Sequence, residues 1–443
     1  MQFFAVEVAR GAGSRADLNF LSEPIWLHCY TKKIVRLGET LRILTYTSLF
    51  PNEAQPVLGV FIYQRMAHVA ARGNEVVVVA PIPYIPRWMP RSQRWDVYKN
   101  IPREERIERL RVYHPRYLLL PGISMPLHGL LMFVGTFFCV RRLHRHCQFQ
   151  GIDAHYVYPD GFAAALIGKL LGLPVVVSAR GTDMNLFPSF RMIRPLIRWT
   201  LENVAGSIAV CTALKTSMVE VGLPAEKVQV IGNGVDPARF QAIDQSEARR
   251  AVGVPESKLM LVAVGSLIPR KGYQFLLPAI AKITGEFPEV VLYIVGEGEA
   301  RKKLEAQSET LGIRNRVVLV GNRPNEELKN WYSAAQVSCL VSSREGWPNV
   351  LLESMACGTP VVATGGWGVP EIITSVELGI IVDQNVESIA AGLRTALRRK
   401  WNPEILIRHS QGRNWDVVAS EVEEYLQDSF GAVSAAIPRV SEV

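Results

Sequence analysis

Two glutamates eight positions apart, Glu345 and Glu353, bracket the stretch of this sequence that is best suited to chemistry. Pro348 suits a first helical position and Gly358 suits the residue past a helix end, which predicts a helix over about 348–357. A helix N-terminus presents free backbone N–H groups and the positive end of its dipole to an anion. Glu345, just before it, can accept hydrogen bonds from hydroxyls. An anion joined to a polyol is therefore indicated, although an ordinary helix with a dipole-complementing glutamate has the same pattern.

The two glutamates could instead be the acid and base of a glycoside hydrolase. If both lay on one helix, a rise of roughly 1.5 Å per residue would separate them by about 12 Å along the axis. The catalytic carboxyl groups of such hydrolases lie only about 5 to 9.5 Å apart. The spacing therefore favours two contacts on one extended ligand over a catalytic pair.

A cationic loop precedes this stretch in the chain. The apolar run 259–264, typical of a buried parallel strand, leads into Gly265 and then into Arg270 and Lys271. Arginine supplies a planar fork and lysine a point charge, which together suit a diphosphate. A surface loop with two solvated charges is the alternative.

A Gly-Glu-Gly turn follows the next apolar run, 290–295. Its glycines, Gly296 and Gly298, let a ligand approach the backbone. Arg301 occupies the place of the third glycine in the dinucleotide-binding fingerprint, so hydride chemistry on a nicotinamide is poorly supported. In the first half of the chain, loops 153–161 and 178–185 also place polar groups beside glycine at predicted strand ends.

Apolar runs and helical periods alternate along both halves of the chain. Strand 41–45, helix 59–72 and the valine-rich strand 75–80 form one strand–helix–strand unit, and the pattern then repeats. The prediction is an α/β chain with two doubly wound domains, and ligands of such parallel sheets bind in a cleft beyond the carboxyl ends of the strands. The expected parts are a flexible extension (1–40), a first domain (41–235), an irregular linker (236–250), a second domain (251–410) and a terminal helix and tail (411–443).

Composition limits the possible classes of function. With 48% hydrophobic and 20% charged residues, the 443-residue chain is folded rather than disordered. A net charge of +8 favours anionic partners, but the excess is small and no nucleic-acid-binding motif occurs, so no nucleic acid is expected. The six cysteines form no C-x-x-C pair, which indicates neither a zinc site nor a disulfide framework and fits a reducing cytoplasm. No secretory signal is evident.

One apolar stretch, 118–140, is long enough to be mistaken for a membrane span. Pro121, Pro126 and His128 interrupt it, and a span here would split one α/β domain, so a buried or membrane-surface helix is predicted. The basic segment 141–146 would suit a cytoplasmic flank. The basic, tryptophan-containing run 87–116 is either a solvated face or a contact for anionic lipid headgroups or a phosphorylated acceptor.

Taken together, these motifs resemble the retaining glycosyltransferases of family 4, which have the GT-B fold. The likeness covers about Leu41 to the C-terminus. It rests on Glu345, Gly346, Pro348, Asn349 and Glu353, on Cys357-Gly358 and Pro360 to Val362, on Gly265 with Arg270-Lys271-Gly272, and on Gly232-Asn233-Gly234-Val235-Asp236. The motifs are specific in combination and weak singly.

The resemblance implies two Rossmann-like domains that face a central cleft, with a nucleotide sugar in the second domain and an acceptor in the first. Arg270 and Lys271 would neutralise the leaving diphosphate, Glu345 would contact the hydroxyls of the donor sugar, and Glu353 would contact the ribose. Backbone amides from Pro348 to Leu351 would approach the phosphates. The implied donor-binding residues are Gly265, Arg270, Lys271, Gly296, Gly298, Glu345, Gly346, Pro348, Asn349, Val350, Leu351 and Glu353.

The resemblance also implies a catalytic role for Asp183, in addition to Glu345, Arg270 and Lys271. It implies an acceptor side made of Gly59, His155, Asp160, Arg180 and Asp183. Taken alone, His155 is better explained as a structural histidine. No metal or cofactor is implied, because cations and a helix N-terminus take the charge. The terminal helix would cross back onto the first domain.

One departure from the family pattern concerns Arg180, which stands where many relatives carry histidine in His-Gly-x-Asp. Arg180 would contact phosphate or an acidic acceptor, and Arg-Gly-Thr-Asp versions are similar to transferases for bacterial envelope polysaccharides. The expected function is transfer of a hexose from a UDP- or GDP-sugar to a saccharide or lipid-linked acceptor, in the cytoplasm or at the inner face of the plasma membrane. A sugar-nucleotide epimerase and a non-catalytic subunit that binds an anionic ligand are the alternatives.

Overall fold

The computed structural model describes residues 40–84, 97–120 and 125–436. All of the described elements lie within one unit, Leu41–Val443. The predicted N-terminal extension lies outside the described residues except for Thr40, and so does part of the basic run, 87–96.

The first half of the chain forms an eight-stranded sheet with the order β10-β9-β8-β7-β1-β2-β5-β4. Neighbouring strands are parallel except β4 and β5, which are antiparallel. The strands are β1 (Arg42–Tyr46), β2 (Glu75–Val79), β4 (Glu104–Ile107), β5 (Leu110–Tyr113), β7 (Gly151–His155), β8 (Val175–Ala179), β9 (Gly206–Ala209) and β10 (Val228–Val230). A second, small parallel sheet pairs β3 (Ile82–Tyr84) with β6 (Arg116–Leu118).

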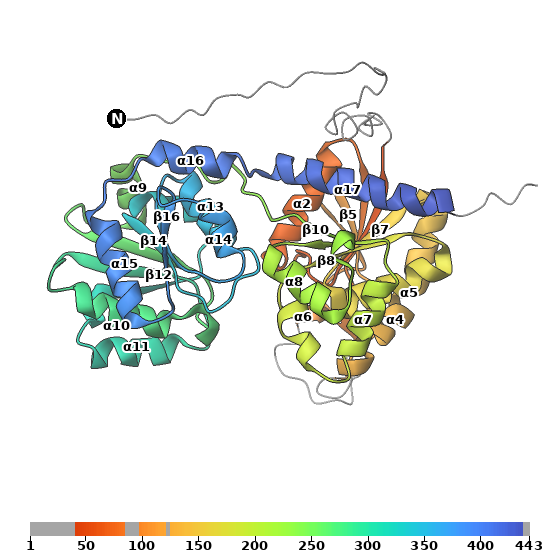
Figure 1. Ribbon diagram of the computed structural model, residues 1–443, viewed down its shortest axis with the longest axis horizontal. Coiled ribbons are helices and arrows are strands. Elements are labelled where there is room, and N and C mark those ends of the chain that lie inside the picture. Colours follow the sequence, from red (N-terminus) through yellow and green to blue (C-terminus); the bar gives the residue numbers. More distant parts are fainter. Residues whose placement is uncertain (1–39, 85–96, 121–124, 437–443) are drawn as a thin grey trace, which may run out of the picture. The chain divides into compact units, whose positions relative to one another are not determined.

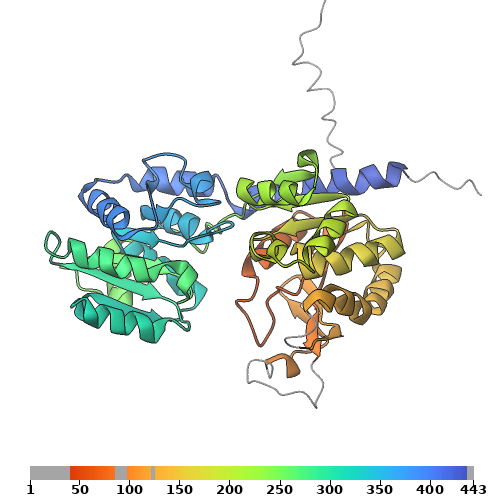
Figure 2. The ribbon, with the colours of Figure 1, turned by 60° about the horizontal axis from the view of Figure 1, so that its bottom comes forward.

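Helices cover both faces of the eight-stranded sheet, because its central strands are apolar on both sides (Figures 1 and 2). The helices of this half are α2 (Val60–Ala71), α4 (His128–Cys147), α5 (Phe162–Leu171), α6 (Thr182–Asn185), α7 (Arg194–Glu202) and α8 (Thr212–Val221). One buried cluster joins the sheet to α4, α5, α7 and α8, and a separate cluster joins it to α2. The predicted parallel α/β architecture is confirmed.

The helix expected in the apolar stretch 118–140 is shifted along the chain. Helix α4 begins at His128 and continues through the basic segment 141–146 to Cys147. Pro126 lies in a short 3₁₀ turn, η2 (Met125–Leu127), where the fixed φ of proline and its missing N–H do no harm. Among the described ranges, no helix combines the length and the apolar character that crossing a membrane requires.

The second half forms a six-stranded, entirely parallel sheet with the order β13-β12-β11-β14-β15-β16. Its strands are β11 (Leu259–Val264), β12 (Val290–Val295), β13 (Val317–Gly321), β14 (Val337–Leu340), β15 (Val361–Thr364) and β16 (Gly379–Val382). Its helices are α9 (Gln245–Val252), α10 (Tyr273–Ile283), α11 (Arg301–Thr310), α12 (Leu328–Ala334), α13 (Asn349–Ala356), α14 (Val369–Ile372), α15 (Val386–Arg398) and α16 (Pro403–Gln411). Each sheet face again has its own buried cluster.

The stretch predicted as an irregular linker, 236–250, ends in a helix. The Asp244 side chain accepts a hydrogen bond from the Glu247 N–H at 3.1 Å, and this cap starts α9 at Gln245. Aspartate followed three residues later by glutamate was a visible capping signal in the sequence.

The terminal helix, α17 (Trp415–Ala436), packs against α2 in the first half (Figure 1). Its apolar face buries Trp415, Val418, Val422 and Leu426 in the same cluster as residues of α2. Phe430 occupies the space above Gly151, where a Cβ atom would lie 2.3 Å from the phenyl ring. Helix α17 therefore joins the end of the chain to the first sheet.

Candidate functional site

Helix α13 begins at Asn349, within one residue of the start that the sequence predicts for the anion-binding helix. Pro348 is the residue before the first helical turn, and Gly358, with φ at +76°, follows the last. The Leu351 N–H already donates to the Pro348 carbonyl at 3.0 Å, and proline has no N–H. Of the amides expected to face an anion, only those of Asn349 and Val350 therefore remain at this end. The amides from Pro348 to Leu351 that were expected to approach the phosphates are thus reduced to these two.

Glu345 lies in the loop between β14 and α13 and is paired with the cationic loop after β11. Lys271 Nζ lies 2.7 Å from Glu345 Oε1, and Arg270 Nη1 lies 3.5 Å from Oε2. Burial pushes the pKa of Glu345 up, but the charge and hydrogen bond of Lys271, helped by Arg270, bring the pKa below its usual value. Glu345 is thus a carboxylate at neutral pH, between two cations.

The glycines of the neighbouring loops explain how these loops approach each other. A Cβ atom on Gly296 would lie 2.1 Å from the Gly265 carbonyl oxygen, and one on Gly298 would lie 2.4 Å from that of Leu267. Gly296 and Gly298 line neither of the two cavities described below. The absence of side chains at these two positions admits the adjacent loop, and their contact with the donor stays a prediction.

A cavity of about 390 Å³, here called the cation cavity, opens beside Glu345. Among the residues that the structure describes, its wall includes three arginines, Arg180, Arg270 and Arg344, and one acid, Glu345. Such a wall attracts an anion while keeping one strong acceptor for hydroxyls. The other lining residues are Phe61, Tyr156, Gly181, Thr182, Asn185, Leu186, Val210, Asn233, Gly346, Trp347 and Asn349.

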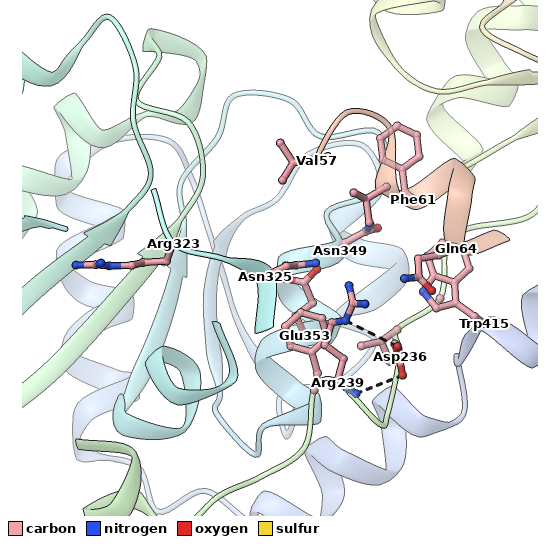
Figure 3. Close-up of a pocket in the computed structure, with 14 residues that line it drawn as sticks. Val57, Phe61, Gln64, Asp236, Arg239, Arg323, Asn325, Asn349, Glu353 and Trp415 are labelled. Atoms are coloured by element: carbon pink, nitrogen blue, oxygen red, sulfur yellow. Dashed lines mark hydrogen bonds and ion pairs between the residues drawn. The ribbon is translucent and has the colours of Figure 1, made fainter. Parts of the chain in front are cut away.

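A second cavity of about 250 Å³, the Glu353 cavity, is lined by Asn349 at the start of α13 and by Glu353 further along the same helix (Figure 3). Asn349 and Phe61 line both cavities, so the two adjoin there. The remaining wall comprises Val57, Val60, Gln64, Gly234, Val235, Asp236, Arg239, Phe240, Arg323, Asn325, Glu353 and Trp415. Glu345 thus lines one cavity and Glu353 lines the adjoining one. This arrangement is compatible with contacts from both carboxyl groups to one extended ligand.

Glu353 differs in ionisation from Glu345. Burial raises its pKa to about 7, against the lowering effect of a 3.0 Å hydrogen bond that Tyr332 Oη donates to Oε2. Near neutral pH this carboxyl group is therefore divided between its protonated and ionised forms.

Asp183, expected to be catalytic, is fully buried and does not line either cavity. Its carboxylate accepts hydrogen bonds from the backbone N–H groups of Val157 (2.9 Å), Gly181 (2.8 Å) and Arg180 (3.1 Å). Burial raises the pKa of Asp183, while these backbone donors oppose the rise. The geometry fits a residue that holds two loops together rather than one that touches a substrate.

His155 also lies inside the protein, in a cluster of charged groups. Its Nδ1 accepts a hydrogen bond from Arg180 Nη2 at 2.8 Å, which leaves the ring proton on Nε2, 3.2 Å from Asp153. Burial lowers the pKa of His155 to about 4, so the ring is neutral. This geometry fits the structural role that the sequence favours for His155 taken alone.

Arg180 connects this cluster to α13. Its Nη1 donates to Asn233 Oδ1 at 3.0 Å, and Asn233 Nδ2 donates to Asn349 Oδ1 at 3.1 Å. Gly346 passes close by, since a Cβ atom there would lie 2.7 Å from the Arg180 carbonyl oxygen. Asn233, Arg344 and Trp347 were given no role from the sequence, although the Gly-Asn-Gly motif contains the first of them.

The last two acceptor-side candidates lie outside both cavity walls. Gly59 has φ at +63° and precedes α2, where a Cβ atom would lie 2.2 Å from the Leu49 carbonyl oxygen. Asp160 is buried and accepts hydrogen bonds from the Ser48 hydroxyl at 3.1 Å and from the Ser48 N–H. Burial raises the pKa of Asp160 to about 7. Within the described ranges, no group of three or more histidine, cysteine, aspartate or glutamate residues could hold a metal ion.

Comparison with known proteins gives two family matches that together span most of the chain. Residues 58–239 match the model described as Glycosyltransferase Family 4, and residues 244–413 match the model described as Glycosyl transferases group 1. The boundary between the matches falls in the stretch after β10.

Individual relatives and solved structures agree with these two family matches. The chain is 25% identical over 374 residues to a putative teichuronic acid biosynthesis glycosyltransferase of Bacillus subtilis, covering 82% of this chain and 92% of that protein. The structure of the present chain is similar to that of sucrose-phosphate synthase from Thermosynechococcus elongatus (TM-score 0.71, 19% identity, 89% of this chain and 100% of that chain). It is also similar to HepE from Anabaena, solved in complex with UDP and glucose (TM-score 0.66, 19% identity, 88% and 100%). These two likenesses concern the fold.

Proposed function

The chain belongs to glycosyltransferase family 4, with the GT-B fold, and from this premise we propose that it transfers a sugar with retention of configuration from a nucleotide-sugar donor. The donor lies across both cavities, with its diphosphate at the start of α13. The observation that carries the proposal is the convergence of Lys271, Arg270 and Glu345 beside the free end of that helix.

The diphosphate binds the amides of Asn349 and Val350 and the cations of the loop after β11. As the bond from the sugar C1 to the diphosphate oxygen breaks, negative charge accumulates on that oxygen. Arg270 and Lys271 stabilise this charge most strongly where it develops, in a partly buried site. Glu345 accepts hydrogen bonds from the sugar hydroxyls. The nucleophile is a hydroxyl of the acceptor, because Glu345, the only acid in the described wall of the cation cavity, is held between two cations. The oxygen of this hydroxyl bonds to the sugar C1 as the bond from C1 to the diphosphate breaks, and its proton passes to the departing diphosphate oxygen.

Glu353 accepts hydrogen bonds from the ribose hydroxyls at the other end of the donor. The base then lies toward Arg323 and Asn325 in the same cavity (Figure 3). UDP is the favoured nucleotide, since the structurally similar HepE was solved with UDP and glucose, and GDP is the alternative.

The acceptor is a saccharide or a lipid-linked saccharide of an envelope polysaccharide. Support comes from the relative named for teichuronic acid biosynthesis and from Arg180, which adds a cation to the acceptor side of the cation cavity and suits an acidic or phosphorylated acceptor. Such an acceptor places the enzyme in the cytoplasm, at the inner face of the plasma membrane.

A thermal-shift screen with UDP, GDP, ADP and their sugars tests the proposal. We expect stabilisation by one nucleotide series, UDP first, followed by transfer from that donor and an α-to-α or β-to-β outcome by NMR of the product. The proposal fails if no donor in the panel is bound, transferred or hydrolysed and Glu345→Gln changes nothing. Isomerised free sugar formed without an acceptor would instead indicate an epimerase.

The affinity for the intact nucleotide sugar is expected to rise about tenfold between pH 6 and pH 8. With a pKa of about 7, Glu353 is ionised in about a tenth of the molecules at pH 6 and in most at pH 8, and only the carboxylate can accept two ribose hydroxyls. Isothermal titration calorimetry measures the change. In Glu353→Gln the pH dependence should disappear, and a tenfold rise that persists in this variant would contradict the assignment.

A further inference from the structure

Helix α4 has two opposite faces of different character. The inward face, made of Gly129, Met132, Thr136, Val140 and Leu143, is buried. The outward face, together with Leu127 just before the helix, carries an apolar ridge of four side chains that are spaced three or four residues apart. Leu127 is 56% exposed, Leu130 45%, Val134 60% and Phe138 74%. Exposed apolar residues scattered singly are ordinary, but a row along one helix marks an interaction surface.

The same outward face becomes cationic beyond the ridge. Arg141 and Arg145 continue the ridge spacing over the last turns of α4, and Arg142 is exposed beside them. The helix contains no acidic residue. Burial lowers the pKa of His144, which disfavours its charged form. Apolar side chains followed by arginines on one face are the pattern of a helix at an anionic bilayer surface.

Contacts on the inward face fix the rotation of α4. Thr136 Oγ1 and Tyr46 Oη are hydrogen bonded at 2.9 Å inside the protein. Gly135 lies so close to Tyr117 that a Cβ atom would be 2.6 Å from the tyrosine Cβ. The Phe138 ring meets that of Phe137, which packs on the core, edge to face at 5.5 Å. The ridge thus points outward without any unfolding of the helix.

We propose that the outward face of α4 docks the protein on an anionic lipid bilayer. The ridge enters the boundary between headgroups and acyl chains, and Arg141, Arg142 and Arg145 contact lipid phosphates. A second copy of the chain is the less suitable occupant, because its own α4 offers these arginines no acid. The inference deepens the proposed location at the membrane, but it concerns a surface separate from both cavities.

Co-sedimentation of the full-length protein with vesicles tests the docking. We expect binding to vesicles of phosphatidylglycerol and phosphatidylcholine and little binding to phosphatidylcholine alone. The double variant Val134→Ser/Phe138→Ser should lose about tenfold or more in vesicle affinity, since membrane affinity follows the buried apolar area. Arg141→Glu/Arg145→Glu should remove the preference for phosphatidylglycerol.

Two controls lie in the other half of the chain. Val376→Ser removes a side chain that is 71% exposed, and Lys302→Glu/Lys303→Glu makes the same change in net charge on exposed positions of α11. Both should bind vesicles like the unchanged protein. All variants should keep hydrolysis of a soluble donor. If the unchanged protein bound vesicles but turned over no donor, the proposed function would fail and the docking proposal would stand.

Several outcomes would overturn the docking proposal. These are equal binding to both kinds of vesicle, no binding to either, or equal losses in the control variants. A dimer by light scattering that Val134→Ser/Phe138→Ser separates would assign the ridge to a second copy instead.

Discussion

Lys271→Met is expected to lower kcat for sugar transfer by about 10²- to 10³-fold, the usual cost of removing one donor that stabilises developing negative charge. Methionine keeps much of the side-chain length and removes the charge that sits 2.7 Å from Glu345. The loss should appear mainly in kcat, because the interaction strengthens as the diphosphate departs. Steady-state kinetics with the donor identified by the thermal-shift screen measures it.

Lys282→Met is the matched control for this change. Lys282 is in the same half of the chain, on α10, and pairs with Glu387 on the surface at 2.8 Å. Its replacement should change kcat by less than about twofold, because exposed ion pairs contribute little. Equal kinetics for the two variants would contradict the role of Lys271.

A structural loss can be separated from a catalytic one at this position. Lys271→Met leaves Glu345 without its nearest cation, which destabilises a mostly buried carboxylate. The double variant Lys271→Met/Glu345→Gln removes that isolated charge and should recover melting temperature. It should not recover kcat. Recovery of both would mean that the single variant had failed only through its fold.

Glu345→Gln is expected to lower kcat/KM for the nucleotide sugar by about 10²-fold. Glutamine keeps the size of the side chain but replaces a carboxylate acceptor by a neutral amide, which weakens hydrogen bonds to hydroxyls of the sugar. The affinity for the nucleoside diphosphate without sugar should be kept or increased, since Lys271 and Arg270 lose their competing partner. Competition assays with the nucleoside diphosphate check this second part.

A loss of kcat/KM with a kept or increased affinity for the nucleoside diphosphate distinguishes this role from a general loss of structure. A misfolded variant would lose affinity for both ligands, and a spectator glutamate would change neither. Unchanged transfer by Glu345→Gln would contradict the proposed contact with the sugar.

The fold was largely predictable because its signals are local and repeated. Valine-rich runs such as 75–79 alternate with helical periods, and this alternation indicates parallel sheets without knowledge of any long-range contact. Predictions failed where a single residue set a boundary. Asp244 caps α9 inside the expected linker, and Pro126 in the turn η2 moves the start of α4.

The candidate site was predictable where loops follow strands of one parallel sheet. The carboxyl ends of β11 and β14 share an edge, so Lys271 and Glu345 meet although many residues separate them in the chain. The sequence does not reveal what surrounds a carboxylate. Asp183 is of a residue type that can act as a catalytic acid, but its carboxylate already accepts hydrogen bonds from three backbone N–H groups.

The remaining features depend on contacts between loops that are distant in the sequence. The hydrogen bonds from Arg180 through Asn233 to Asn349 join positions that no local pattern relates. The close approach of Gly296 to Gly265 likewise explains a glycine by its neighbour in space rather than by a ligand. Such contacts require the folded structure.

Isothermal titration of UDP and of the intact UDP-sugar against Glu345→Gln and Glu353→Gln tests the central claim that one donor spans both cavities. The account predicts that Glu353→Gln weakens both ligands about tenfold or more, because both carry the ribose. Glu345→Gln should weaken the sugar nucleotide while leaving UDP as tightly bound as before, or tighter. Equal effects of the two variants on UDP, or no effect of either on the intact donor, would contradict it.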